Sequence, residues 1–236
     1  MQTGPVHPPV STPPLFWWAV LAFALLALVP TLWTSVDFFF AGLFAGPHKR
    51  LEAKDWWWVE LINLYVPLVF RWIVFGSVAL LVLSVAWKRL VPLRITLAFL
   101  ALAITTGPGL VVNGVFKDHW QRARPYQVAE FGGPQKFTRA AVITDQCDNN
   151  CSFVSGHVAC GFFLMSMLLL APSRRRTWLA LGAVCGLLIG FARMADSAHW
   201  LSDVLWAGPI TMLSSWLVWQ LLLRFPRRAD PPGLAP

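Results

Sequence analysis

The chain has 236 residues, of which 57% are hydrophobic and only 13% are charged, and its formal net charge is +8 at pH 7. Its mean hydropathy of +0.59 is also high. These values lie outside the range of soluble globular domains, so the composition excludes an ordinary soluble protein and predicts a membrane protein. Nucleic acid does not explain the positive charge, because the basic residues are divided between short loops and one polar cluster.

Six apolar stretches are long enough to cross a bilayer as helices. They begin, in chain order, at Leu15, Leu61, Ile95, Phe153, Trp178 and Val204. Each is close to the roughly 17–25 residues that span about 30 Å of hydrocarbon. We therefore predict an all-α bundle of six transmembrane helices over residues 15–224, with Pro-rich disordered tails at residues 1–14 and 225–236.

The first stretch lies where a signal peptide would lie. No cation precedes it and no small-x-small cleavage site is evident, so we expect a retained helix.

The charge distribution predicts which side of the membrane each loop faces. If both termini are cytoplasmic, the lysines and arginines divide almost equally between the two sides, so that count decides little. All acidic residues except Asp230 then lie outside, and the inner loops are short and basic. We therefore expect cytoplasmic termini and polar loops on the outer side of the membrane.

Three polar segments that are distant in the sequence are predicted to meet at this outer interface. They are KDHWQRARP at 117–125, CSFVSGH at 151–157 and FARMADSAHWLSDV at 191–204. The first two lie at the two ends of the loop between the third and fourth spans, and the last joins the fifth span to the sixth. The active site is therefore expected at the outer membrane–water interface.

The residue types in these segments suit a phosphate group and its transfer. Cationic side chains, a serine hydroxyl and the backbone N–H groups of a helix start form a receptor for a phosphate dianion. His199 and Asp203 are four residues apart, so on a helix they share a face and the carboxylate can orient the imidazole. A histidine held in this way is a nucleophile toward phosphorus, and His157 can protonate the leaving oxygen.

The three segments resemble the signature of the type 2 phosphatidic acid phosphatases, which is K-x6-RP, PSGH and SR-x5-H-x3-D. Here they read Lys117-x6-Arg124-Pro125, Val154-Ser155-Gly156-His157 and Ala192-Arg193-x5-His199-x3-Asp203. Val154 and Ala192 thus replace a proline and a serine, and neither change removes a charge. The resemblance covers about residues 95–224.

This resemblance implies a role for each matched residue. His199 would attack phosphorus to give a phospho-histidine, Asp203 would orient it, and His157 would be the general acid. The phosphate oxygens would be held by Lys117, Arg124, Ser155, Gly156 and Arg193. No metal or other cofactor is implied, because the cations stabilise the charge on the transferred group.

A site at the bilayer surface implies an amphiphilic lipid phosphate as the substrate. The long loop, with its additional cations Arg122, Lys136 and Arg139, is most like bacterial lipid A phosphatases, since a multiply anionic head group needs added positive charge. This resemblance implies a bacterial inner-membrane protein whose active site faces the periplasm. The alternatives are an undecaprenyl pyrophosphate or phosphatidylglycerol phosphate phosphatase, and a lipid phosphotransferase. No obligate protein partner is evident.

A non-catalytic lipid-phosphate binding protein or a transporter is a different class. A transporter would carry polar positions near the bilayer midplane, whereas most polar residues here gather at one surface.

Three residues outside the motifs are left with open explanations. Cys147 and Cys151 favour a disulfide in an oxidising periplasm, although they could stay reduced, and a zinc site that includes His157 or His119 is a weaker alternative. Arg71, within the second span, either extends to the membrane surface, pairs with an acid or binds a lipid head group.

Two further patterns concern the packing of the spans. Gly182, Gly186 and Gly190 recur every four residues, which predicts a bare face on the fifth span where another helix approaches closely. The tryptophans of DWWWVE at 55–60 suit an aromatic belt at the outer interface.

Overall fold

The computed structural model describes residues 12–48 and 53–224, and these residues form helices and loops without a β-strand. The all-α prediction is therefore confirmed. The two predicted tails lie outside the described residues, apart from residues 12–14.

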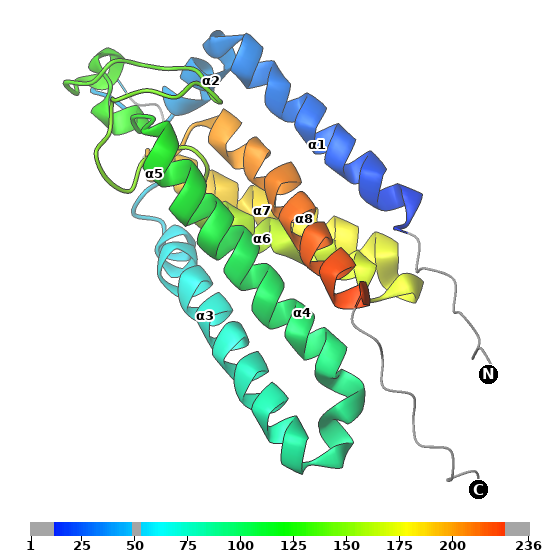
Figure 1. Cartoon of the computed structure of the whole chain (residues 1–236). Coiled ribbons are helices and arrows are strands. Elements are labelled where there is room, and N and C mark those ends of the chain that lie inside the picture. The colour runs from blue at the N-terminus through cyan, green and yellow to red at the C-terminus, as the bar shows by residue number, and fades with distance from the viewer. Residues whose placement is uncertain (1–11, 49–52, 225–236) are drawn as a thin grey trace, which may run out of the picture.

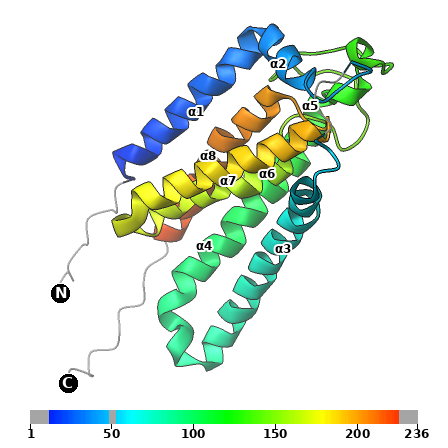
Figure 2. The same cartoon turned by 180° about the vertical axis from the view of Figure 1, so that it is seen from behind.

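The long helices run roughly side by side in a bundle, as Figures 1 and 2 show from opposite sides. They are α1 (Pro14–Leu32), α3 (Trp57–Ala86), α4 (Arg94–Ile104) with its π-helical continuation η2 (Thr105–Phe116), α6 (Gly156–Ser166), α7 (Arg175–Ala195) and α8 (Leu201–Arg224). The short helices are α2 (Thr34–Ala41), α5 (Lys117–Trp120) and the 3₁₀ turns η1 (Lys88–Leu93), η3 (Pro125–Gln127), η4 (Ala129–Phe131), η5 (Met167–Leu169) and η6 (Pro172–Arg174).

Four helical stretches in the described residues are long and apolar enough to cross a membrane. They are Pro14–Leu32, Trp57–Ala86, Lys88–Gln127 and Pro172–Ala195. The fourth predicted span corresponds to α6 with η5, which is apolar but shorter, and the sixth corresponds to α8, which is not one of these four. The chain is thus an integral membrane protein, and its sixfold crossing stays a prediction.

The outer surfaces of α1 and α3 are apolar. Trp18 is 68% exposed, Trp72 65% and Val85 82%. Such continuous apolar surface is unfavourable in water and is suited to contact with lipid tails. These two helices therefore face the hydrocarbon.

Close helix contacts hold the bundle together, with α6 packed against α7 and α8, and α1 against α8. The glycine prediction for α7 is confirmed. A Cβ on Gly182 would collide with Met165 of α6, and one on Gly186 with the ring of Phe162. A Cβ on Gly190 would likewise collide with Val204 of α8. Small residues let these backbones approach to a distance that a larger side chain would prevent.

The two ends of the bundle differ in character. The η1 turn and η6 lie at one end, whereas α2, α5 and the long segment between α5 and α6 gather at the other (Figure 1). Within that segment Cys147 and Cys151 form a disulfide, so the disulfide explanation of this pair is confirmed over the zinc site. The π-helix that leads to α5 contains Pro108, whose carbonyl accepts a bond of 2.7 Å from the Asn113 side chain.

Candidate active site

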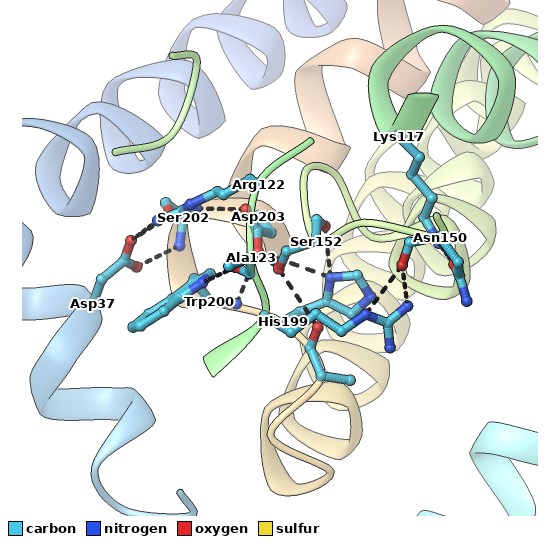
Figure 3. Close-up of polar contacts among 12 residues, drawn as sticks. Asp37, Lys117, Arg122, Ala123, Asn150, Ser152, His199, Trp200, Ser202 and Asp203 are labelled. Carbon is cyan, nitrogen blue, oxygen red and sulfur yellow. Dashed lines mark hydrogen bonds and ion pairs between the residues drawn. The ribbon is translucent and has the colours of Figure 1, made fainter. Parts of the chain in front are cut away.

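The three polar segments meet at the end of the bundle that carries α2 and α5 (Figure 3). Lys117 begins α5, and Ser155 and Gly156 stand at the start of α6. Arg193 lies in the last turn of α7, His199 in the connection that follows, and Asp203 in the first turn of α8. The sharp turn between α7 and α8 therefore places His199 beside the residues that precede α6.

His199 is buried in a defined orientation. Its Nδ1 lies 2.8 Å from the carbonyl oxygen of Ser152. A carbonyl only accepts hydrogen bonds, so Nδ1 carries the proton and Nε2 keeps its lone pair. The carboxylate of Asp203 lies 3.8 Å from Nδ1, farther than a hydrogen bond. Sequence reasoning expected Asp203 to orient the ring directly, whereas here Ser152 supplies the acceptor.

The surroundings of His199 keep its imidazole neutral. Burial lowers the pKa of His199 to about 3; the nearby carboxylate of Asp203 raises this pKa, and the charges of Arg193 and Lys117 lower it. A neutral imidazole with a free Nε2 is the form that can attack phosphorus.

This lowered pKa makes the stability of the protein depend on pH. Because the folded-state pKa of His199 is about 3 and the unfolded-state value about 6.5, the unfolded chain binds more protons as the pH falls below about 6.5. Between about pH 7 and pH 5 we expect the free energy of unfolding to fall by about 2 kcal/mol through this group. Thermal unfolding in detergent should show a smaller loss in His199→Asn than in the wild type, where His199 adds its share to that of the partly buried His157. His119→Asn, at an exposed histidine, should show the full wild-type loss, and an equal loss in the two variants would contradict the burial of His199.

Asp203 is completely buried and accepts hydrogen bonds from several sides. Its Oδ2 accepts from the hydroxyl of Ser152 and, at 2.9 Å, from the backbone N–H of Trp200. Its Oδ1 accepts from Nη1 of Arg122 at 2.5 Å. The same serine thus contacts Asp203 through its hydroxyl and His199 through its carbonyl.

Arg122 is completely buried and joins Asp203 to a second carboxylate, Asp37 of α2 (Figure 3). Its Nη2 donates to Asp37 at 2.9 Å, and its Nε donates to the carbonyl of Thr138 at 2.9 Å. Asp37 also accepts from the backbone N–H of Ser202 at 2.8 Å. Two buried carboxylates require a cation between them.

The expected head-group role of Arg122 is therefore wrong, because its guanidinium is buried between Asp37 and Asp203. Lys136 and Arg139, which sequence reasoning grouped with it, are exposed. Sequence reasoning missed Asp37 altogether, because a single acid after the first span carries no motif.

Asn150 holds two of the predicted phosphate-binding cations. Nζ of Lys117 donates to its side-chain oxygen at 2.8 Å, and Nε and Nη2 of Arg124 donate to its carbonyl at 3.1 and 2.6 Å. Asn150 has a φ of 49°, a left-handed conformation that asparagine tolerates better than most residues. Sequence reasoning did not identify it, although its position in CDNNC, directly before the second motif, was a signal.

On the opposite side, Asn63 of α3 connects His157 to Arg193. Nε2 of His157 lies 3.1 Å from the Asn63 carbonyl, and Nη1 of Arg193 donates to the Asn63 side chain at 2.7 Å. Arg193 also pairs with Asp196 at 2.9 Å. Neither Asn63 nor Asp196 was identified from the sequence.

Two buried donors in the site have no hydrogen-bond partner in the described part of the chain. They are the hydroxyl of Ser155 and Nε of Arg193. Buried polar groups are nearly always paired, so these two are suited to an anionic ligand. Gly156 follows Ser155, and a Cβ there would lie 2.7 Å from the side-chain oxygen of Asn113. Only glycine fits this close approach at the helix N-terminus, where N–H groups favour an anion.

Comparison with known proteins identifies the family. The family model described as the PAP2 superfamily matches residues 93–227, which contain every motif residue of the site. The chain belongs to the PAP2 superfamily. Its PAP2 region begins close to the start of α4 and includes all later helices, so α1 to α3 lie before it.

Curated relatives of this PAP2 protein carry one name. A lipid A 4'-phosphatase of Francisella tularensis subsp. novicida (strain U112) is 32% identical over 203 residues, 82% of this chain and 89% of the relative. A lipid A 4'-phosphatase of Rhizobium leguminosarum is 31% identical over 88% of this chain and 91% of its own length. One of Rhizobium etli (strain ATCC 51251 / DSM 11541 / JCM 21823 / NBRC 15573 / CFN 42) is 39% identical over 51% of this chain and 46% of its own.

No solved structure matches the chain. Family membership and the apolar helices together make it a membrane lipid phosphatase.

Proposed function

We propose that this PAP2 protein removes the 4'-phosphate of lipid A, with His199 as the nucleophile. One observation carries the proposal. His199 is neutral, with its proton on Nδ1 and a free Nε2, and it lies among cations and buried donors without a partner in the described residues, which come from three sequence-distant segments. That combination suits in-line attack on a phosphate whose charge is stabilised by fixed donors.

In the first proposed step, Nε2 of His199 forms a bond to phosphorus as the bond from phosphorus to the sugar oxygen breaks. His157 enters this step as an imidazolium. Its Nε2 keeps the proton that faces the Asn63 carbonyl, and the proton on Nδ1 passes to the leaving sugar oxygen. In the second step water attacks phosphorus as the bond from phosphorus to Nε2 of His199 breaks, Nδ1 of His157 takes up the proton from the water, and phosphate leaves.

The oxygens of the transferred phosphoryl group are held by Lys117, Arg124 and Arg193, with the Ser155 hydroxyl and the backbone N–H of Gly156. Ser155 and Arg193 each contribute a buried donor that lacks a partner among residues 12–48 and 53–224. Asp203 acts through Ser152, whose carbonyl fixes the tautomer of His199.

The proposed topology has six crossings, with α6 and α8 added to the four apolar stretches and both termini in the cytoplasm. The end that carries η1 and η6 is basic and supports a cytoplasmic position under the positive-inside rule. The site then faces the periplasm of the inner membrane. The Cys147–Cys151 disulfide supports an oxidising compartment on that side.

Lipid A is proposed as the substrate because the relatives matched over most of the chain are named for it. A polar pocket of about 420 Å³ beside the site gives further support. It is lined by Tyr126, Phe131, Asp55 and Asp196 among others, and aromatic rings with carboxylates suit a sugar. Since Asp196 also pairs with Arg193, this pocket could hold the saccharide next to the phosphate.

The test is a comparison of substrates with the purified protein in detergent and a chelator of divalent ions. We expect release of the 4'-phosphate from lipid A, at a higher kcat/KM than release from undecaprenyl pyrophosphate, phosphatidylglycerol phosphate or phosphatidate. Mass spectrometry of the product identifies the phosphate that is lost. Faster release from another of the four lipids, or loss of activity on chelation, would contradict the proposal.

A further inference from the structure

A pocket of about 520 Å³ leads from the active site along the inside of the bundle wall. His157, Lys117 and Asn150 line one end of it, while α3 and η2 form its sides. Phe75 on its wall is 57% exposed, so the pocket reaches the lipid-facing surface of α3. A lipid whose phosphate occupies the site could therefore lay its chains in this pocket without leaving the bilayer.

Arg71 is the charged residue on the α3 wall of the pocket. It is exposed and makes no hydrogen bond or ion pair within residues 12–48 and 53–224. An arginine inside a membrane span is costly and usually serves a function.

Two of the three explanations for Arg71 do not fit the structure. It lies in the middle of the 30-residue helix α3, about 21 Å from either end at 1.5 Å per residue, which is farther than an arginine side chain reaches. The facing segments α4, η2 and α6 contain no acidic residue, and the acid of α3 itself, Glu60, is three helical turns away. A ligand of the pocket is the remaining partner.

The distance from the site indicates which part of a lipid Arg71 meets. His157 contacts the carbonyl of Asn63 at 3.1 Å, and Arg71 follows Asn63 by eight residues, about 12 Å along the helix axis. Side chains on a helix tilt toward its N-terminus, so the guanidinium lies closer to the site than that. In an acylated lipid this depth below the phosphate holds the ester and amide oxygens that join the chains to the head group.

We propose that Arg71 and this pocket form a subsite for the acyl linkages of the substrate. The inference rests on the proposed function, and it adds a determinant of selectivity. The guanidinium donates to carbonyl and hydroxyl oxygens of fatty-acyl chains, which polyprenyl chains lack. Arg71 then selects acylated lipid phosphates over polyprenyl phosphates that present the same phosphate to His199.

The test compares two phosphorylated glucosamine lipids, one with ester- and amide-linked acyl chains and the other with alkyl ether chains of equal length. Losing a hydrogen bond to a charged donor is worth about ten- to hundredfold in affinity. We therefore expect Arg71→Leu to lower kcat/KM by this factor for the acyl lipid, chiefly through KM, and to leave the ether lipid unchanged. Arg71→Lys should lower kcat/KM for the acyl lipid by a smaller factor. Arg89→Leu, at the exposed turn after α3, is the control and should change neither.

Binding of both lipids to Arg71→Leu and to the parent chain, each in a His199→Ala background, separates this subsite from the reaction. Selective loss of acyl-lipid affinity supports the subsite. Equal binding of the acyl lipid with and without Arg71, or equal losses for the two lipids, overturns it. Lipid that binds with the expected selectivity but is not cleaved by the wild type overturns the proposed function instead.

Discussion

Replacing Arg122 with leucine is expected to remove most of the activity and to lower the free energy of unfolding by about 3–5 kcal/mol, because it leaves two buried carboxylates without their shared cation. Asp37 and Asp203 are both completely buried, and each lies within 3 Å of the guanidinium. Without it Asp203 must take up a proton or move, and either change disturbs Ser152 and the orientation of His199. Thermal unfolding and kcat in detergent measure the two losses.

Matched variants separate charge from geometry. Arg122→Lys keeps the charge but lacks the forked guanidinium that contacts Thr138, Asp203 and Asp37 together. We therefore expect a free energy of unfolding between those of the wild type and Arg122→Leu, and a low kcat. Asp37→Asn should lower the free energy of unfolding by less than Arg122→Leu does. In the double variant Asp37→Asn/Arg122→Leu the loss should be smaller than the sum of the two single losses, since one unpaired buried charge is removed. Arg139→Leu, an exposed cation of the same segment, is the control. Wild-type stability in Arg122→Leu would contradict the network.

The helices could be predicted from the sequence because the hydrophobic signal is long and local. Apolar stretches at residues 15 and 61 correspond closely to α1 and α3. The fourth stretch is less clear, because α6 begins at Gly156 inside the site and is short. Hydropathy cannot separate a short apolar helix from a full crossing, and it carries no information on α2.

In the candidate site, too, some residues could be predicted from the sequence and others could not. Motif residues such as His199 and Arg193 could be placed together because their spacing and chemistry are recorded in the chain. Their partners could not, because Asn63, Asp37 and Ser152 come from segments whose approach depends on tertiary packing. Arg122 is an example. Its charge suggested a role at the surface, whereas its ion pairs with Asp37 and Asp203 place it in the interior.

His199→Ala is expected to lower kcat for phosphate release by about four to six orders of magnitude, since the nucleophile has no substitute within the site. The protein should remain folded and should still bind lipid phosphate, because the cations and unpaired donors belong to other residues. Steady-state phosphate release and equilibrium lipid binding test this split. Loss of binding together with activity would mean that His199 supports the site structurally, and a loss of less than tenfold would exclude it as the nucleophile.

The most direct measurement of the central claim is exchange of oxygen between ¹⁸O-labelled inorganic phosphate and water. A phospho-histidine route is reversible, so free phosphate in the site must form the same intermediate and release water. We predict that the wild type replaces ¹⁸O in phosphate stepwise, as seen by mass spectrometry, and that His199→Ala does not. A wild-type protein that hydrolyses its lipid without any exchange, or a His199→Ala variant that exchanges at the wild-type rate, would contradict catalysis through His199.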